Sequence, residues 1–190
     1  GDDWVFFDTE EFNDITYLFI DPSNRARAYM AGDFQLLFKT TDAGETWEKI
    51  TPSGLGINFT FAIAFNSIGE GVISGRTSFA ERGLLYRTSD GGSNWELVYR
   101  DSTKRYNDLK IIGFSTFVAV GDSGMIIRST DQGNTWTPIN SGTTAQLLKL
   151  HLNGSNLWAL GNNLLLRSTN AGATWSSMNI DIDLFPYDFA

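Results

Sequence analysis

The chain has 190 residues and a formal net charge of −8, and 42% of its residues are hydrophobic. This composition excludes a disordered chain and argues against nucleic acid as a partner, since phosphate contacts require a basic surface. There is no cysteine, one histidine (His151) and no apolar run near the ~20 residues of a membrane-spanning helix, so we expect no metal site, no cofactor and no membrane span.

In chain order, the sequence predicts four groups of three short strands. The first strand of each group is strongly apolar and is expected to be innermost, buried on both faces. The second strand ends in glycine. The predicted strands are Ile15–Ile20, Ala28–Gly32 and Leu36–Lys39; Phe59–Phe65, Gly71–Gly75 and Leu84–Arg87; Leu109–Phe114, Phe117–Gly121 and Met125–Arg128; Leu147–Leu152, Leu157–Gly161 and Leu164–Arg167. The second group carries an insertion of about five residues, within 76–83, between its second and third strands.

A nonapeptide follows the third strand of every group. The four copies are KTTDAGETW (39–47), RTSDGGSNW (87–95), RSTDQGNTW (128–136) and RSTNAGATW (167–175), and their tryptophans are spaced by 48, 41 and 39 residues. This spacing is the length of one four-stranded propeller blade, about 40–45 residues. The sequence therefore predicts an all-β fold, a β-propeller built from four repeats, with four to five blades or as part of a larger ring.

The residue types of the nonapeptide suit a tight turn between a third and a fourth strand. The acidic or amide side chain can cap backbone N–H groups, glycine supplies a positive φ, and tryptophan packs as the chain enters the last strand. Asn170 replaces the aspartate in the fourth copy, where we expect a weaker but intact turn. Because the same group recurs in every repeat, we assign these residues a structural role: Asp42, Gly44, Trp47, Asp90, Gly92, Trp95, Asp131, Gly133, Trp136, Asn170, Gly172 and Trp175.

The nonapeptide resembles the Asp box of the BNR-repeat families. Segments 28–47 (AYMAGDFQLLFKTTDAGETW) and 118–136 (VAVGDSGMIIRSTDQGNTW) are most similar to the photosystem II assembly and stability factor-like group. The resemblance implies a non-enzymatic scaffold that helps to assemble or stabilise other proteins. It covers residues 15 to 180 approximately.

We interpret the chain as a single domain, 1–190, with blades at about 15–50, 57–98, 107–139 and 146–180. The ends, 1–14 and 181–190, resemble a fourth and a first strand that could contribute to a closing blade. Three arrangements remain open: a compact ring with a degenerate closing blade, half of a ring completed by a second copy as a homodimer, or part of a longer propeller.

Four loops should face the channel mouth, 51–58, 76–83, 99–108 and 138–146, and basic and aromatic residues gather in two of them, 76–83 and 99–108. Arginine with exposed aromatic residues is typical of interaction hot spots, and guanidinium groups recognise carboxylates. We therefore expect an acidic peptide or protein, or a glycan, as partner. The candidate binding residues are Arg76, Phe79, Arg82, Arg100, Lys104, Arg105 and Tyr106.

The alternative is a carbohydrate-binding propeller, or one like the sialidases and glycoside hydrolases. Such enzymes need paired carboxylates, or a tyrosine nucleophile with an arginine triad. Arg76, Arg82 and Arg105 with Tyr106 could form the second arrangement, but no Asp or Glu stands out as a general acid. We expect no catalytic residue, and an extracytoplasmic location in a bacterium: periplasmic, cell-surface or secreted.

Overall fold

The computed structural model describes residues 14–77 and 82–178. Within these residues the chain forms four antiparallel sheets of four strands each, in chain order. Blade 1 contains β1 (Ile15–Ile20), β2 (Ala28–Gly32), β3 (Leu37–Thr40) and β4 (Glu48–Ile50); blade 2 contains β5 (Phe59–Phe65), β6 (Gly71–Arg76), β7 (Gly83–Thr88) and β8 (Glu96–Asp101). Blade 3 contains β9 (Tyr106–Ile112), β10 (Thr116–Gly121), β11 (Ile126–Ser129) and β12 (Thr137–Ile139); blade 4 contains β13 (Leu147–Asn153), β14 (Asn156–Gly161), β15 (Leu164–Ser168) and β16 (Ser176–Met178).

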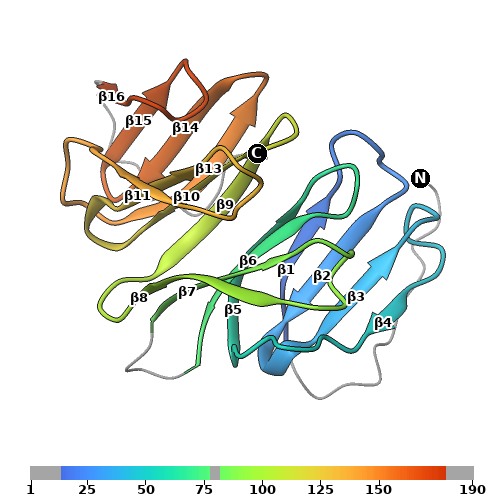
Figure 1. The fold of residues 1–190 in the computed structure, drawn as a ribbon. Coiled ribbons are helices and arrows are strands. Elements are labelled where there is room, and N and C mark those ends of the chain that lie inside the picture. The colour runs from blue at the N-terminus through green and yellow to red at the C-terminus, as the bar shows by residue number, and fades with distance from the viewer. Residues whose placement is uncertain (1–13, 78–81, 179–190) are drawn as a thin grey trace.

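The four sheets follow one another as the blades of a β-propeller, which confirms the predicted fold (Figure 1). The first strand of each blade packs along that of the next, β1 on β5, β5 on β9 and β9 on β13. Among the described residues β13 does not pack along β1 in the same way. The predicted closing segments, 1–14 and 181–190, lie outside the described residues except for Asp14.

The strand bounds agree with the prediction to within one residue, with β9 as the exception. This strand begins at Tyr106 rather than Leu109, and it ends at Ile112 rather than Phe114. A register shift pairs Tyr106 with Gly121, so the strand starts earlier than its apolar pattern indicates. Gly113 follows with a φ of 62°, and this turn leaves Phe114 47% exposed.

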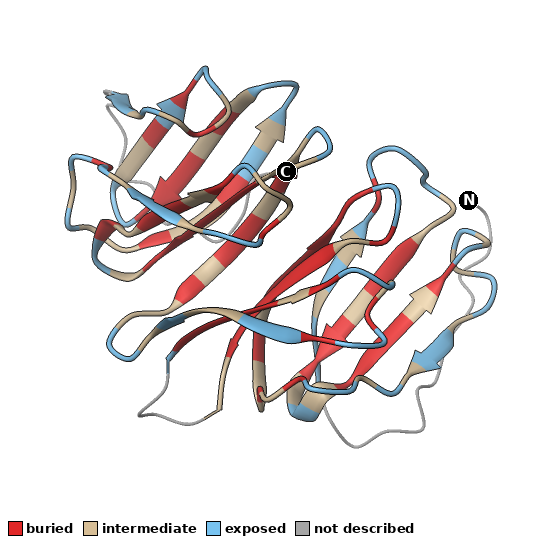
Figure 2. Cartoon of the chain, in the orientation of Figure 1, coloured by how far each residue is buried: buried red, intermediate tan, exposed pale blue. Residues whose placement is uncertain are grey.

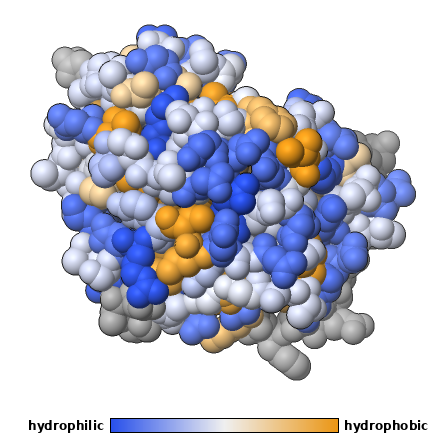
Figure 3. Space-filling view, in the orientation of Figure 1, coloured by the Kyte–Doolittle hydropathy of each residue, from blue (hydrophilic) through white to orange (hydrophobic). Residues whose placement is uncertain are grey.

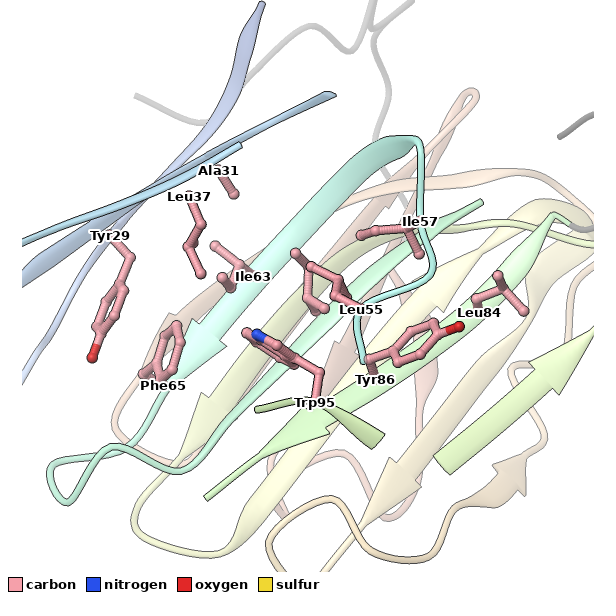
Figure 4. Close-up of a cluster of buried hydrophobic side chains, with 11 residues drawn as sticks. Tyr29, Ala31, Leu37, Leu55, Ile57, Ile63, Phe65, Leu84, Tyr86 and Trp95 are labelled. Carbon is pink, nitrogen blue, oxygen red and sulfur yellow. The ribbon is translucent and has the colours of Figure 1, made fainter. Parts of the chain in front are cut away.

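The hydrophobic core lies between consecutive blades, where the sheet faces meet (Figures 2 and 4). Between blades 1 and 2, the Tyr29 and Phe65 rings stack with centroids 3.7 Å apart. The Trp95 ring meets Phe65 edge-on at 6.1 Å. Trp95 therefore packs at the interface of blades 1 and 2, whereas the sequence predicted only that it packs as the chain enters the last strand.

The expectation that every first strand is buried on both faces is wrong for β1. Residues Ala62–Phe65 of β5 are 0% exposed, because blades 1 and 3 flank this strand. In β1, by contrast, Leu18 and Ile20 are 55% and 54% exposed. Blade 2 covers one face of blade 1, and Tyr17 of β1 also contacts Asp108 and Lys110 of blade 3.

Segment 51–58 also differs from its prediction as a loop at the channel mouth. It runs between blades 1 and 2, with Leu55 5% and Ile57 0% exposed. The Ser53 N–H donates to the Ser93 carbonyl, and the Trp95 N–H donates to the Ser53 carbonyl, both at 2.8 Å. The segment therefore fastens the two blades together.

Each Asp box forms the turn between the third and fourth strands of its blade. The two residues after the Asp or Asn have positive φ in every copy, for example 62° at Gln132 and 86° at Gly133. In the third box, Asp131 Oδ1 accepts the Thr135 N–H at 2.9 Å, and the Ser129 hydroxyl accepts the Gly133 N–H at 2.9 Å. Asn170 Oδ1 accepts the Thr174 N–H at the same distance, 2.9 Å, so the fourth turn is intact.

Candidate functional site

The two ends of the blades form two different faces, which we call lower and upper without reference to the orientation of Figure 1. The lower face carries the Asp boxes, and each box is bound to the turn between the first two strands of its own blade. The Ala43 N–H donates to the backbone carbonyl of Ala26 at 2.8 Å, and the Gln132 N–H donates to that of Ser115 at 2.9 Å. The upper face carries the loops between second and third strands and the connections from blade 2 to 3 and from 3 to 4, where the basic candidate residues lie.

The structure brings five basic candidates to the upper ends of blades 2 and 3. Arg76 ends β6, and the exposed Arg82 directly precedes β7. Arg100, also exposed, is opposite Leu84 near the end of β8, and Lys104 and Arg105 form the turn into β9. Phe79 lies outside the described residues.

Two of these guanidinium groups lie over phenylalanine rings of β5. The Arg76 Cζ is 4.2 Å from the Phe59 ring centroid, and the Arg105 Cζ is 5.7 Å from that of Phe61. Phe59 and Phe61 lie at the same end of β5, where a register shift between Thr60 and Ala62 interrupts the regular pairing with β6. Cation–π contact orients both arginines without neutralising them.

Phe34 extends this aromatic surface from blade 1. Its side chain is 58% exposed, and its ring centroid is 6.0 Å from that of Phe59. The residue has a φ of 54°, a conformation that costs about 1–3 kcal/mol for a bulky side chain. The matching positions of blades 3 and 4 are Ser123 and Asn163, with φ of 55° and 53°.

We call this set of residues the upper-face patch. It combines three phenylalanines, which the sequence interpretation missed, with five basic side chains that it named. The signal for Phe34 was present, as a large residue after Gly-Asp where the third blade has serine. The patch consists of Phe34, Phe59, Phe61, Arg76, Arg82, Arg100, Lys104 and Arg105.

Tyr106 belongs to the core rather than to this surface. It is 1% exposed, and its ring meets Tyr99 edge-on at 5.8 Å. Burial, together with Tyr99, raises the pKa of the Tyr106 phenol. Its described contacts give it a packing role at the interface of blades 2 and 3.

Acidic residues next to the patch accept hydrogen bonds from the loops that carry its basic side chains. Asp122 Oδ2 accepts from Arg105 Nε at 3.3 Å, and the Arg105 side chain remains 39% exposed. Burial acts to raise the pKa of Asp122, but hydrogen bonds from Arg105 hold it below its usual range. Asp101 similarly accepts the Thr103 and Lys104 N–H groups, at 2.8 and 3.1 Å. These carboxylates fix the loops, and the Arg105 side chain keeps exposed surface.

Besides this surface patch, the molecule has a concavity of about 500 Å³ at the channel, lined by residues of β1, β9 and β13. Asp108 is at its base and is 1% exposed. It accepts the Tyr17 hydroxyl at 2.6 Å and the Leu150 N–H at 2.8 Å. Burial and the neighbouring Asp108 raise the pKa of Tyr17. Asp108 thus joins blades 1, 3 and 4 through its hydrogen bonds.

Within residues 14–77 and 82–178, no group of three or more His, Cys, Asp or Glu side chains is placed to hold a metal ion. No helix there has the length and apolar character to span a membrane. Figure 3 shows the apolar residues of one face as separate small patches among hydrophilic ones.

Known proteins share this architecture. A solved structure described as YCF48 bound to D1 peptide superposes with a TM-score of 0.64 and 23% identity, over 88% of this chain and 54% of the other. An ancestral GH74 enzyme superposes with a TM-score of 0.69 and 18% identity, over 89% of this chain and 24% of that one. Likenesses at these identities show the fold alone.

Sequence similarity identifies the family. The Photosystem II assembly lipoprotein Ycf48 of Picosynechococcus sp. is 32% identical over an alignment of 172 residues, and the match covers 70% of this chain and 51% of that protein. The chain thus spans about half the length of this relative. Residues 3–137 match the family described as Photosynthesis system II assembly factor YCF48. This match covers more than half of the sequence, so the chain belongs to the YCF48 assembly-factor family.

Proposed function

We propose that this chain is a non-enzymatic propeller module that binds an acidic, extended segment of a protein partner across the upper-face patch. The observation that carries the proposal is the stacking of Arg76 and Arg105 over Phe59 and Phe61, beside the exposed Phe34. Such a surface offers aromatic area and charge-assisted hydrogen bonds to carboxylates in one place. Membership of an assembly-factor family, and a related structure described with a bound peptide, support a protein partner.

The ionisable groups support binding rather than catalysis. A glycosidase needs a carboxylic acid with a raised pKa, or an activated tyrosine. Hydrogen bonds hold the pKa values of Asp101 and Asp122 low, and burial raises those of Tyr17 and Tyr106. None of these four groups has the raised carboxyl pKa of a general acid or the lowered phenol pKa of an activated tyrosine.

Fluorescence anisotropy with a labelled acidic peptide tests this proposal, with the same peptide carrying Gln for Glu and Asn for Asp as its neutral control. The double variant Arg76→Ala, Arg105→Ala should weaken binding of the acidic peptide by roughly 10-fold or more. Arg25→Ala is the matched control, because Arg25 is an exposed arginine in the lower-face turn between β1 and β2. Equal binding by the double variant and the control would refute the proposed site.

We also propose an extracytoplasmic location, since the matched Picosynechococcus relative is named a lipoprotein. Fractionation of the native cells, probed with an antibody to this chain, should find it outside the cytoplasm. Recovery in the cytoplasmic fraction alone would contradict the proposed location.

A further inference from the structure

Three asparagines of the chain are followed by a small residue. Asn66 and Asn140 precede serine, and Asn153 precedes Gly154. An asparagine in this position is prone to lose its side-chain amide, because the backbone nitrogen of a small following residue can reach the asparagine side-chain carbonyl. Glycine hinders this approach least, since it has no side chain and the widest range of backbone conformations. The folded structure then decides which of the three sites can react.

Hydrogen bonds hold the side chains of the two asparagines that precede serine. Asn66 is 2% exposed, and its Oδ1 accepts the N–H groups of Ile68 and Glu70 at 3.1 and 3.0 Å. Asn140 Oδ1 accepts the Gly142 N–H at 2.9 Å. In both cases the carbonyl that would be attacked is fixed by its acceptor role, so the fold protects these two side chains.

The second Asp box contains an aspartate followed by glycine, Asp90–Gly91, which can cyclise in the same way. Its turn protects it. Asp90 Oδ1 accepts the Asn94 N–H at 2.9 Å, and the Gly91 N–H donates to the Gly69 carbonyl at 2.9 Å. The hydrogen bond from Asn94 also lowers the pKa of Asp90, and an ionised carboxylate is a poor target for attack. Both reacting groups are therefore held in place.

Asn153 has none of this protection. It ends β13 on the lower face and pairs with Asn156 across a two-residue turn, Gly154–Ser155. Gly154 has a φ of 62°, as the first turn residue of a type II′ hairpin does. Asn153 and Gly154 are exposed, and a Cβ added to Gly154 would meet nothing within 4 Å. Within residues 14–77 and 82–178, no hydrogen bond holds the Asn153 side chain or the Gly154 N–H.

We propose that Asn153 is a site of spontaneous deamidation in the folded protein. The Gly154 backbone nitrogen loses its proton to solvent base and attacks Asn153 Cγ. The new bond from nitrogen to Cγ replaces the bond from Cγ to Nδ2, and the side-chain nitrogen leaves as ammonia. Water then opens the cyclic imide at either of its carbonyl carbons. Attack at Cγ gives aspartate, whereas attack at the main-chain carbonyl carbon breaks the original peptide bond and gives isoaspartate.

The two products affect blade 4 differently. Isoaspartate carries the main chain through Cβ and Cγ, which adds a methylene group before Gly154 and disrupts the pairing with Asn156. It also displaces the Ser155 carbonyl, which anchors the fourth Asp box by accepting the Ala171 N–H at 3.1 Å. Aspartate adds the same charge but leaves the main chain unchanged. Isoaspartate at position 153 therefore loosens the fourth box, and the new charge alone does not.

Peptide mapping by mass spectrometry, after incubation of the folded 190-residue chain at mildly alkaline pH, measures the reaction at each asparagine. The reference for each site is its rate in a short synthetic peptide of the same sequence. Asn153 should react in the folded chain within roughly 10-fold of its peptide rate, since a hairpin tip opens at little cost in free energy. Asn66 and Asn140 should be slowed by a further factor of roughly 10 or more, because attack must first break their hydrogen bonds. Equal slowing at all three sites overturns the proposal.

Two variants separate the altered backbone from the added charge. Asn153→Gln should abolish the reaction at this position, because glutamine would have to close a larger ring. Freshly prepared Asn153→Asp should keep the urea midpoint of the unmodified chain, whereas the purified isoaspartate form should unfold at lower urea and exchange hydrogen faster in segment 167–175. Equal midpoints for these two forms would contradict the inferred effect on the fourth box. Binding at the upper-face patch should be the same in all forms, so this test does not depend on the proposed function.

Discussion

The lower and upper faces of this propeller differ in whether their loops repeat from blade to blade. On the lower face every blade repeats the same turn, with one capping carboxylate or amide and a pair of left-handed residues whose second member is glycine. On the upper face the equivalent loops differ, and blade 1 carries Phe34 where blade 3 has Ser123. The comparison teaches that repetition here marks structure, while departures from the repeat mark the surface available for recognition.

The largest effect should come from a glycine that packs closely against the preceding blade. Gly133→Ala places a Cβ 2.6 Å from Val72 at a φ of 86°, so strain and overpacking act together. We expect a loss of about 2–4 kcal/mol in the free energy of unfolding, measured by urea denaturation. Gly142→Ala in an upper loop, with a φ of 73° and nothing within 4 Å, should lose only about 1 kcal/mol. Equal losses in the two variants would show that the contact with the preceding blade adds nothing to the cost of backbone strain.

The side chain that caps an Asp box should contribute less to stability than the glycine that packs against the preceding blade. Asp90 accepts the Asn94 N–H at 2.9 Å and the Thr88 hydroxyl at 2.8 Å. Asp90→Ala should therefore cost about 1–2 kcal/mol in the same urea assay. Asn170→Ala serves as the comparison, and a loss there larger than at Asp90 would contradict our interpretation of Asn170 as the weaker cap.

The sequence was sufficient for the lower face because the box is local. Asp, Gly and Trp at fixed spacing specify a turn whose hydrogen bonds close within a few residues. The sequence was insufficient where contacts between residues far apart in the chain decide which side chains are buried. Tyr106 is buried through a register shift against β10, and segment 51–58 is buried because two blades enclose it. Exposure of β1 depends on which blades flank it, and no local pattern of residues encodes that.

Replacement of Phe34 should raise the stability of the fold and weaken peptide binding at the same time. Phe34→Asn removes a bulky residue from a left-handed conformation that asparagine tolerates, so we expect a gain of about 1 kcal/mol in unfolding free energy. The same change should weaken the acidic peptide in the anisotropy assay. A variant that loses stability while binding normally would show that Phe34 serves the fold.

The smallest effect should be the pH dependence of the boxes, because their carboxylates are largely in contact with solvent. Hydrogen bonds from Thr46 lower the pKa of Asp42 to about 2 from an ordinary value of 3.8, and hydrogen bonds from Asn94 also lower that of Asp90. Since these folded-state pKa values are depressed, their stabilisation is present above about pH 4 and is lost as the pH falls toward 2. The urea midpoint should fall across that window, and less so in a variant with Asn at Asp42, Asp90 and Asp131. An identical fall in that variant would assign the effect to other groups.

Hydrogen–deuterium exchange of the chain, with and without a bound acidic peptide, tests the division between the two faces most directly. We predict slower exchange on binding in upper-face segments 33–36, 59–61 and 100–106, and unchanged exchange in the four Asp boxes. Slowing confined to the boxes at 39–47, 87–95, 128–136 and 167–175 would contradict the account and place recognition on the repeated face.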